Sequence, residues 1–83
     1  MPYHKNKQQA FQAAQQGFEE VKNLYENLNP NSPEYGHVLK RLNQEIVEAR
    51  QQIESAHEVA SETQRKVLEK YESELDQMTR EIE

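Results

Sequence analysis

The fold of this chain is decided by the stretch from Ser32 to Ala60, which reads SPEYGHVLKRLNQEIVEARQQIESAHEVA. It opens on Ser32 and Pro33, a pair typical of a helix start. Its apolar residues then recur at alternating steps of four and three: Tyr35, Leu39, Leu42, Ile46, Ala49, Ile53, Ala56 and Ala60. An α-helix turns once per about 3.6 residues, so these side chains share one narrow face. The stretch is predicted to be a helix with an apolar stripe that needs a cover.

Composition limits what can cover this stripe. We expect the 83 residues to form one domain, residues 1–83. The chain has no cysteine, so neither a disulfide nor a thiolate metal site can staple a small core. Hydrophobic residues make up 34% of the sequence, and two glycines with three prolines are too few for a turn-rich β protein. The predicted fold class is all-α.

The charge and hydropathy patterns exclude several kinds of partner. The net charge is −5 and the charges are spread along the chain, whereas nucleic-acid binding needs clustered cations that neutralise phosphates. No apolar run approaches the roughly 20 residues of a membrane span, and residues 1–5 lack the apolar core of a signal peptide. We expect a cytoplasmic protein that binds neither nucleic acid nor membrane.

A second apolar stripe precedes the first and predicts a helix at about residues 5–28. Its apolar residues again follow steps of three and four: Phe11, Ala14, Phe18, Val21, Tyr25 and Leu28. Residues 27–33 should stop this helix, because Pro30 disfavours helical backbone in the residue before it. Ser32 can then cap a helix at about residues 33–58.

So short a connection makes the two helices antiparallel neighbours and fixes which residues face each other. Large side chains then meet large ones, and small meet small. The predicted facing pairs are Leu28 with Tyr35, Tyr25 with Leu39, Val21 with Leu42, Phe18 with Ile46, Ala14 with Ala49, and Phe11 with Ile53.

The first stripe ends at Ala60. The apolar residues beyond it, displaced by one position, are Leu68, Tyr71, Leu75, Met78 and Ile82. In a straight helix this displacement rotates the stripe by about 100°. The break coincides with Ser61-Glu62-Thr63-Gln64, in which the Ser and Gln side chains can satisfy helix-start amides reciprocally. We expect a turn near residues 57–62 and a third helix at about 62–82.

Two architectures satisfy this pattern. In the first, the helices form an antiparallel up-down-up three-helix bundle. In the second, no turn forms, since neither Gly nor Pro occurs between His37 and Glu83, and a helix of about fifty residues dimerises through its second half. Along the helix axis, the stripe from Leu68 to Ile82 is about as long as the stripe from Phe11 to Leu28. A third helix can therefore close the hairpin, which favours the bundle.

Two pairs of residues have the Glu-x-x-His spacing of helical di-iron proteins, namely Glu34 with His37 and Glu54 with His57. They lie about 30 Å apart on one predicted helix, so they cannot form a single site within one chain. They also flank the apolar stripe rather than occupy it. We predict no metal ligand here and interpret both pairs as solvated helix surface.

Two further charged patterns favour plain helix surface. Glu54, Glu58 and Glu62 form a ridge at steps of four, which could hold a hard cation but is more simply an acidic face. Asp76 and Arg80 are four residues apart and are expected to pair weakly along the third helix.

No residue pattern indicates catalysis. Tyr25, Tyr35 and Tyr71 occupy stripe positions, where we expect core rings with the hydroxyl at the rim, and Tyr3 lies outside the stripe. The sequence has neither a nucleophile motif beside a histidine nor a glycine-rich phosphate loop. We predict that the protein is not an enzyme, with no catalytic residues and no cofactor.

The layout of a short helix, an Asn/Pro turn and longer Gln- and Glu-rich segments resembles that of small uncharacterised helical proteins of spore-forming Gram-positive bacteria. A second likeness is to the sporulation-associated aspartyl-phosphate phosphatases, helical hairpins with Ser-Gln-Glu-Leu-Asp on their second helix. Asn43-Gln44-Glu45-Ile46-Val47 stands at a similar distance after the turn, with Asn first and Val last, and Glu72-Ser73-Glu74-Leu75-Asp76 keeps Glu-Leu-Asp. These resemblances imply a cytoplasmic bacterial protein and, for the second, binding to a response regulator.

The pattern as a whole favours a non-enzymatic protein-interaction or regulatory module that acts through a helix face. The partner-binding face that we expect is the apolar stripe of the third helix: Leu68, Tyr71, Leu75, Met78 and Ile82. As the last element, this helix should be held least tightly and could open to a protein partner. The alternatives are a structural homo-oligomer, including a homodimer, and a phosphatase-like hairpin.

Overall fold

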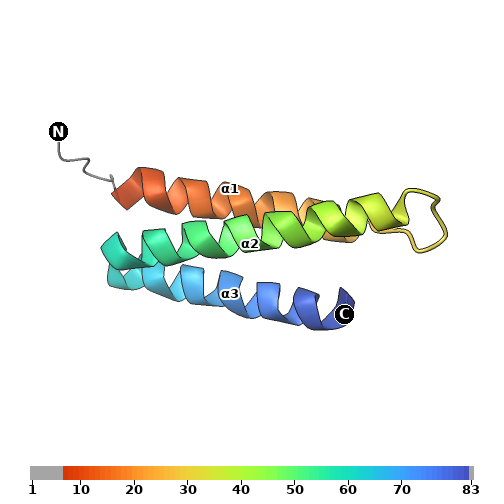
Figure 1. The fold of residues 1–83 in the computed structure, drawn as a ribbon. Helices are drawn as coiled ribbons and strands as arrows, with labels where there is room; N and C mark the ends of the chain where they lie inside the picture. Colours follow the sequence, from red (N-terminus) through yellow and green to blue (C-terminus); the bar gives the residue numbers. More distant parts are fainter. Residues whose placement is uncertain (1–6, 83) are drawn as a thin grey trace.

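The computed structural model describes residues 7–82, which form three helices and, within that range, no strand. They are α1 (Lys7–Glu26), α2 (Tyr35–Val59) and α3 (Glu62–Ile82). The three helices run up, down and up, with α2 in contact with both neighbours (Figure 1). The predicted all-α three-helix bundle is confirmed, although residues 5 and 6 of the first expected helix lie outside the described residues.

The core is a single apolar cluster to which all three helices contribute. Its buried members are Ala10, Ala14, Phe18, Val21, Leu42, Ile46, Ala49, Ile53, Ala56, Leu68, Leu75 and Met78. Every buried side chain among the described residues is apolar. The α2 members all belong to the predicted stripe, whose Tyr35, Leu39 and Ala60 are only half-buried. On α1 the core begins at Ala10, and Phe11 is half-buried. The sequence reading therefore missed Ala10, because alanine is too common on solvated helix surfaces to mark a core position by itself.

The contact between α1 and α2 is the most extensive in the molecule. Small residues allow a close approach at its centre, since a Cβ atom added to Gly17 would lie 3.6 Å from both Cα and Cβ of Ala49. The same Cβ atom would lie 2.8 Å from Oε1 of Gln52. Gly17, which is a poor helix former, is thus used where the two helices come together.

The turn that begins α3 forms where the apolar stripe breaks. Ala60 ends α2 in an extended conformation with φ −76° and ψ 147°. The backbone N–H of Ser61 donates to Oε1 of Gln64 at 3.1 Å, and the backbone N–H of Gln64 donates to Oγ of Ser61 at 3.2 Å. This reciprocal capping box confirms the predicted turn, and the alternative of one long helix is not the structure adopted.

The predicted start of α2 is too early by two residues. Oγ of Ser32 does accept a hydrogen bond from the backbone N–H of Glu34, at 3.2 Å, but the N–H of Tyr35 bonds the carbonyl of Ser32, which closes a tighter turn. Glu34 then has φ −93° and ψ 4°, outside the α region. The helix itself consequently begins at Tyr35, after Pro33 rather than at it.

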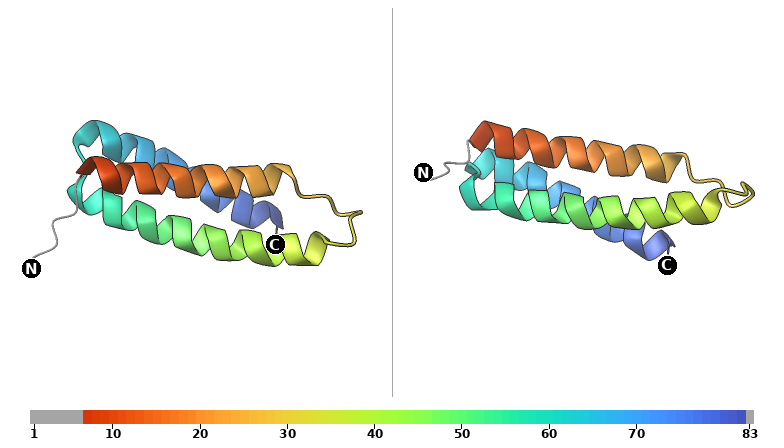
Figure 2. Two further views of the ribbon diagram at one scale, coloured as in Figure 1. Left: turned by 90° about the horizontal axis from the view of Figure 1, so that it is seen from above. Right: turned by 45° about the horizontal axis from the view of Figure 1, so that its top comes forward.

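The bundle is elongated, with principal extents of 47, 28 and 16 Å. Figure 2 shows that α3 runs obliquely across the pair formed by α1 and α2. The C-terminus of α3 stops short of the α1–α2 turn, which projects beyond it (Figure 1). One end of the bundle is therefore closed by the α2–α3 turn, and the other end is only partly covered.

Candidate functional site

The structure buries most of the face that the sequence predicted for partner binding. Leu68 and Leu75 have no exposed surface and Met78 is 8% exposed, while Tyr71 and Ile82 are half-buried. The ring of Tyr71 stacks on that of Phe18 in α1, with centroids 4.3 Å apart and planes 16° from parallel. In this structure the face closes the hairpin, and only Tyr71 and Ile82 of its five residues retain appreciable exposed surface.

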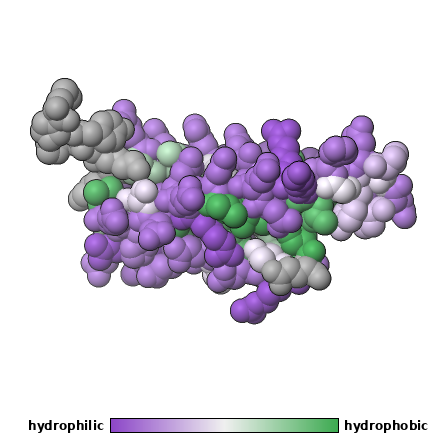
Figure 3. Space-filling model, viewed as in Figure 1, coloured by the Kyte–Doolittle hydropathy of each residue, from purple (hydrophilic) through white to green (hydrophobic). Residues whose placement is uncertain are grey.

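A hollow lies at this open end of the bundle, between the end of α3 and the α1–α2 turn. We call it the end hollow; its volume is about 370 Å³ and its lining residues are Tyr25, Glu26, Leu28, Pro30, Tyr35, Glu81 and Ile82. Figure 3 shows apolar surface beside the end of α3, on a face that is otherwise largely hydrophilic. The sequence stripes contained four of these residues and predicted that Leu28 faces Tyr35, but they gave no sign that Ile82 would join them at an uncovered end.

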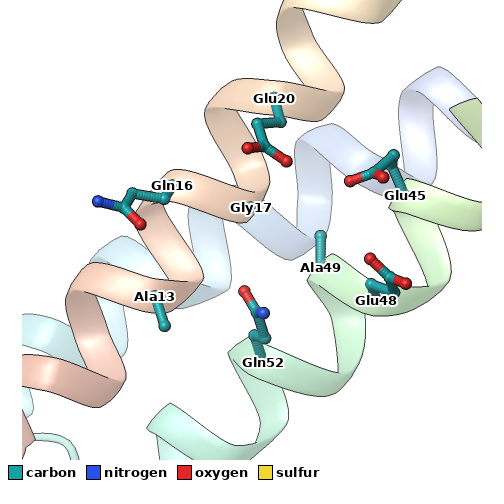
Figure 4. A pocket seen from close by; sticks show the side chains of 8 residues that line it. All are labelled: Ala13, Gln16, Gly17, Glu20, Glu45, Glu48, Ala49 and Gln52. Atoms are coloured by element: carbon teal, nitrogen blue, oxygen red, sulfur yellow. The ribbon is translucent and has the colours of Figure 1, made fainter.

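A second hollow, of about 130 Å³, lies in the groove between α1 and α2. Its lining includes the carboxyl groups of Glu20, Glu45 and Glu48, and those of Glu20 and Glu45 point toward each other across the groove (Figure 4). Partial burial is the largest cause of a raised pKa at Glu45, followed by the charge of Glu48 and then by the hydrogen bond and charge of Glu20. Arg41 opposes this shift. The groove thus disfavours the ionised form of Glu45 relative to a carboxylate in water.

A third hollow, of about 510 Å³, lies between α2 and α3 and is lined by Glu54, His57, Glu58, Arg65 and Glu72. Nε2 of His57 lies 4.0 Å from Oε1 of Glu69 on α3, at the limit of an ion pair. The pair of Glu54 and His57 therefore lies beside carboxylates of α3. The other Glu-x-x-His pair, Glu34 and His37, is exposed near the start of α2. No group of three or more potential ligands among the described residues has the geometry of a metal site.

The predicted carboxylate ridge is interrupted by the α2–α3 turn. Glu54 and Glu58 are exposed on α2, but Glu62 is the first residue of α3. At that position a negative charge interacts favourably with the positive end of the helix dipole. The three carboxylates are therefore divided between two helices rather than aligned on one.

Asp76 pairs with Arg50 of α2, a pairing that the sequence did not predict. Its Oδ1 lies 2.8 Å from Nη2 of Arg50 on α2, rather than pairing with Arg80 as expected. The same Nη2 donates to Oγ1 of Thr79 at 3.4 Å, and that hydroxyl donates to the carbonyl of Leu75. The sequence did contain a clue to this pairing, because Arg50 directly follows the stripe residue Ala49. Arg50 therefore lies on the side of α2 that the displaced apolar stripe of α3 must approach.

The tyrosines at stripe positions are all half-buried, as expected of rings with the hydroxyl at the rim. Burial is the main cause of a raised pKa at Tyr71, with smaller contributions from the charges of Glu19 and Glu74. Tyr25 and Tyr35 line the end hollow. Tyr3 lies outside the described residues.

The segments that carry the phosphatase resemblance belong to different helices. Residues 43–47 are in α2, where Ile46 is in the core and Val47 is 55% exposed to solvent. Residues 72–76 are in α3, where Leu75 is in the core and Asp76 pairs with Arg50.

No described helix has the length and apolar character needed to cross a membrane.

Comparison with known proteins identifies no relative. No family model matches the chain, and neither a curated protein nor a solved structure matches it.

Proposed function

We propose that this protein is a non-enzymatic protein-interaction module that binds its partner through the apolar face of α3. In the closed bundle only part of that face is accessible, at the half-buried Tyr71 and Ile82. The rest of the face becomes available when α3 leaves the hairpin of α1 and α2, and the partner then replaces the hairpin as its cover. Recognition of this kind lays the apolar stripe of one helix into a groove made by others.

The observation that carries the proposal is the unequal packing of the three helices. α3 contacts α2 and α1 less extensively than α1 and α2 contact each other. It is joined to α2 by only Ala60 and Ser61, and its far end stops short of the α1–α2 turn (Figure 1). An element with few buried contacts belongs to the low-stability part of a fold.

The free-energy cost of release sets what a partner must offer. Leu68, Leu75 and Met78 are buried by the hairpin, and exposing each costs roughly 1.5–3 kcal/mol. A partner must therefore present a comparable apolar groove. The partner binds only the fraction of molecules in which α3 has left the hairpin, so its apparent affinity is the intrinsic affinity multiplied by that fraction. Any change that weakens the packing of α3 on the hairpin without altering the apolar face should therefore tighten partner binding.

Arg50 provides such a change, since it lies on α2 and contacts Asp76 and Thr79 of α3. The immobilised full chain would be exposed to a lysate of the source organism, with wild type, Arg50→Gln and Arg41→Gln compared side by side. Arg41 is an exposed residue of the same helix, so its variant controls for the lost charge. A surface ion pair contributes about 0.2–1 kcal/mol, so Arg50→Gln should capture the partner about 1.4- to 5-fold more strongly.

Equal capture by the Arg50 and Arg41 variants would contradict binding through a released α3. Loss of all capture in the Arg50 variant would also contradict it, because that result would place Arg50 itself in the binding surface. Light scattering after gel filtration on each variant distinguishes a foreign partner from self-association.

A further inference from the structure

We infer that the end hollow is a docking site for an apolar side chain on a basic segment of another protein, with the hollow holding the side chain and its acidic rim holding flanking Lys or Arg residues. The inference rests on the proposed function for the kind of activity, protein binding. It does not require α3 to leave the hairpin, because the end hollow is open in the closed bundle.

The floor of the end hollow is apolar and comes from every element of the fold. Tyr25 belongs to α1, Leu28 and Pro30 to the turn, Tyr35 to α2 and Ile82 to α3. Apart from the exposed Pro30, these side chains are half-buried, so each retains surface that a partner can cover. Side chains seated in such pockets usually contribute most of the affinity of an interface. At about 370 Å³ the hollow falls in the size range of ligand sites and can hold one large side chain.

The charges around the floor select the occupant. Glu26 and Glu81 are the two charged residues that line the hollow, and no cation is among the described residues that do so. α1 ends here and α2 begins here, so the opposite partial charges of these two helix ends offset each other. Glu26 and Glu81 then leave a negative field, which favours a cationic segment and would speed its approach.

The same charges disfavour a second copy of this chain. A two-fold dimer through the end hollow would place the acidic rim of one protomer against the acidic rim of the other, because each uses the same patch. The chain as a whole has a net charge of −5, so general attraction between copies is also absent. A basic partner segment removes both penalties.

The test uses a synthetic peptide of twelve residues with Leu and Phe at steps of three and four, Lys at all other positions, and blocked ends. Binding to the full ¹⁵N-labelled chain is followed by NMR, with the largest shifts expected at Leu28, Tyr35 and Ile82. Two control peptides replace Leu and Phe by Ala, or every Lys by Glu, and both should bind at least about tenfold more weakly.

Matched protein variants separate the end hollow from general attraction to an acidic protein. Ile82→Ser should weaken binding about tenfold, whereas Val47→Ser, at an exposed apolar position of α2, should leave it within about twofold. The double change Glu26→Gln and Glu81→Gln should weaken it several-fold more than Glu58→Gln with Glu62→Gln, which removes the same charge near the other end. Since these charged residues are exposed, the double variants keep the core intact.

Equal weakening by the two double variants, or shifts centred away from the end hollow, would overturn the inference. So would a mass that doubles with concentration and reverts in Ile82→Ser, because that result makes a second copy the occupant. If the peptide binds as expected while Arg50→Gln and Arg41→Gln capture equally, then α3 release fails and the end hollow stands. If the peptide does not bind as expected while Arg50→Gln captures the partner more strongly than Arg41→Gln, the end hollow is rejected and α3 release stands.

Discussion

The two interfaces of this bundle are built differently. α1 and α2 meet along a stripe in which small residues alternate with large ones, and at Gly17 and Ala49 the helices come close together. α3 meets them through larger side chains, a ring stack between Tyr71 and Phe18, and a polar contact from Arg50. The first interface is the more extensive and forms a hairpin, while the second adds a helix to that hairpin. This difference underlies the proposal that α3 leaves the bundle with less disruption than either of the other helices.

The largest expected loss of stability comes from truncating one fully buried leucine in each of the two interfaces. Leu42→Ala on α2 and Leu75→Ala on α3 should each lower the free energy of unfolding by about 2–5 kcal/mol, measured by urea denaturation. Leu75→Ala should lower the protection of α3 amides more than that of α2 amides. A loss shared equally by all three helices would show that the two interfaces are one cooperative unit.

A smaller effect is expected at the junction between the two interfaces. Ser61→Ala removes the acceptor for the N–H of Gln64 and should lower the free energy of unfolding by about 1 kcal/mol. Ser73→Ala, at an exposed position within α3, should be neutral or slightly stabilising and serves as the control. If Ser61→Ala has no effect in thermal melts, the capping box does not hold the start of α3.

The third prediction strengthens the hairpin. Gly17→Ala should raise the free energy of unfolding by about 0.5–1 kcal/mol, because alanine favours helix. The new methyl group lies at ordinary contact distance from Ala49, and the close atom is Oε1 of Gln52, the end of a flexible side chain. Gly36→Ala, where nothing lies within 4 Å, measures the helix effect without a neighbour. Destabilisation by Gly17→Ala alone would mean that Gln52 cannot move aside.

The smallest effect concerns the carboxyl groups between α1 and α2. Because the fold raises the pKa of Glu45, its ionised form destabilises the folded state, and this penalty appears as the pH rises through that pKa. Glu45→Gln should therefore stabilise the protein by a few tenths of a kcal/mol at pH 7 and lose that advantage at lower pH. Urea denaturation at several pH values, with Glu58→Gln as the control, makes the comparison. An advantage that is constant with pH would contradict this account.

Much of the fold followed from spacing alone. The stripe of α2 predicted its buried residues because the helical period leaves one face for the core. The displaced stripe and the Ser61 and Gln64 pattern predicted the second turn, which carries no Gly or Pro. Local signals were less decisive at the ends of helices, since Pro33 and Ser32 fit a helix start but the backbone at Glu34 delays it.

The candidate site was less predictable. The stripe of α3 was found, but periodicity does not say whether a face is covered by its own chain or by another. The spacing predicts that Leu28 faces Tyr35, whereas Ile82 joins them because α3 crosses the hairpin obliquely and stops short of the turn (Figure 2). That crossing depends on how side chains of all three helices interdigitate, which no single segment encodes.

Native-state hydrogen exchange on the wild-type chain tests most directly whether α3 is the releasable part of the bundle. The account predicts that amides between Leu68 and Met78 exchange at least about tenfold faster, after correction for intrinsic rates, than amides between Leu42 and Ile53. Equal protection of the two segments would contradict it.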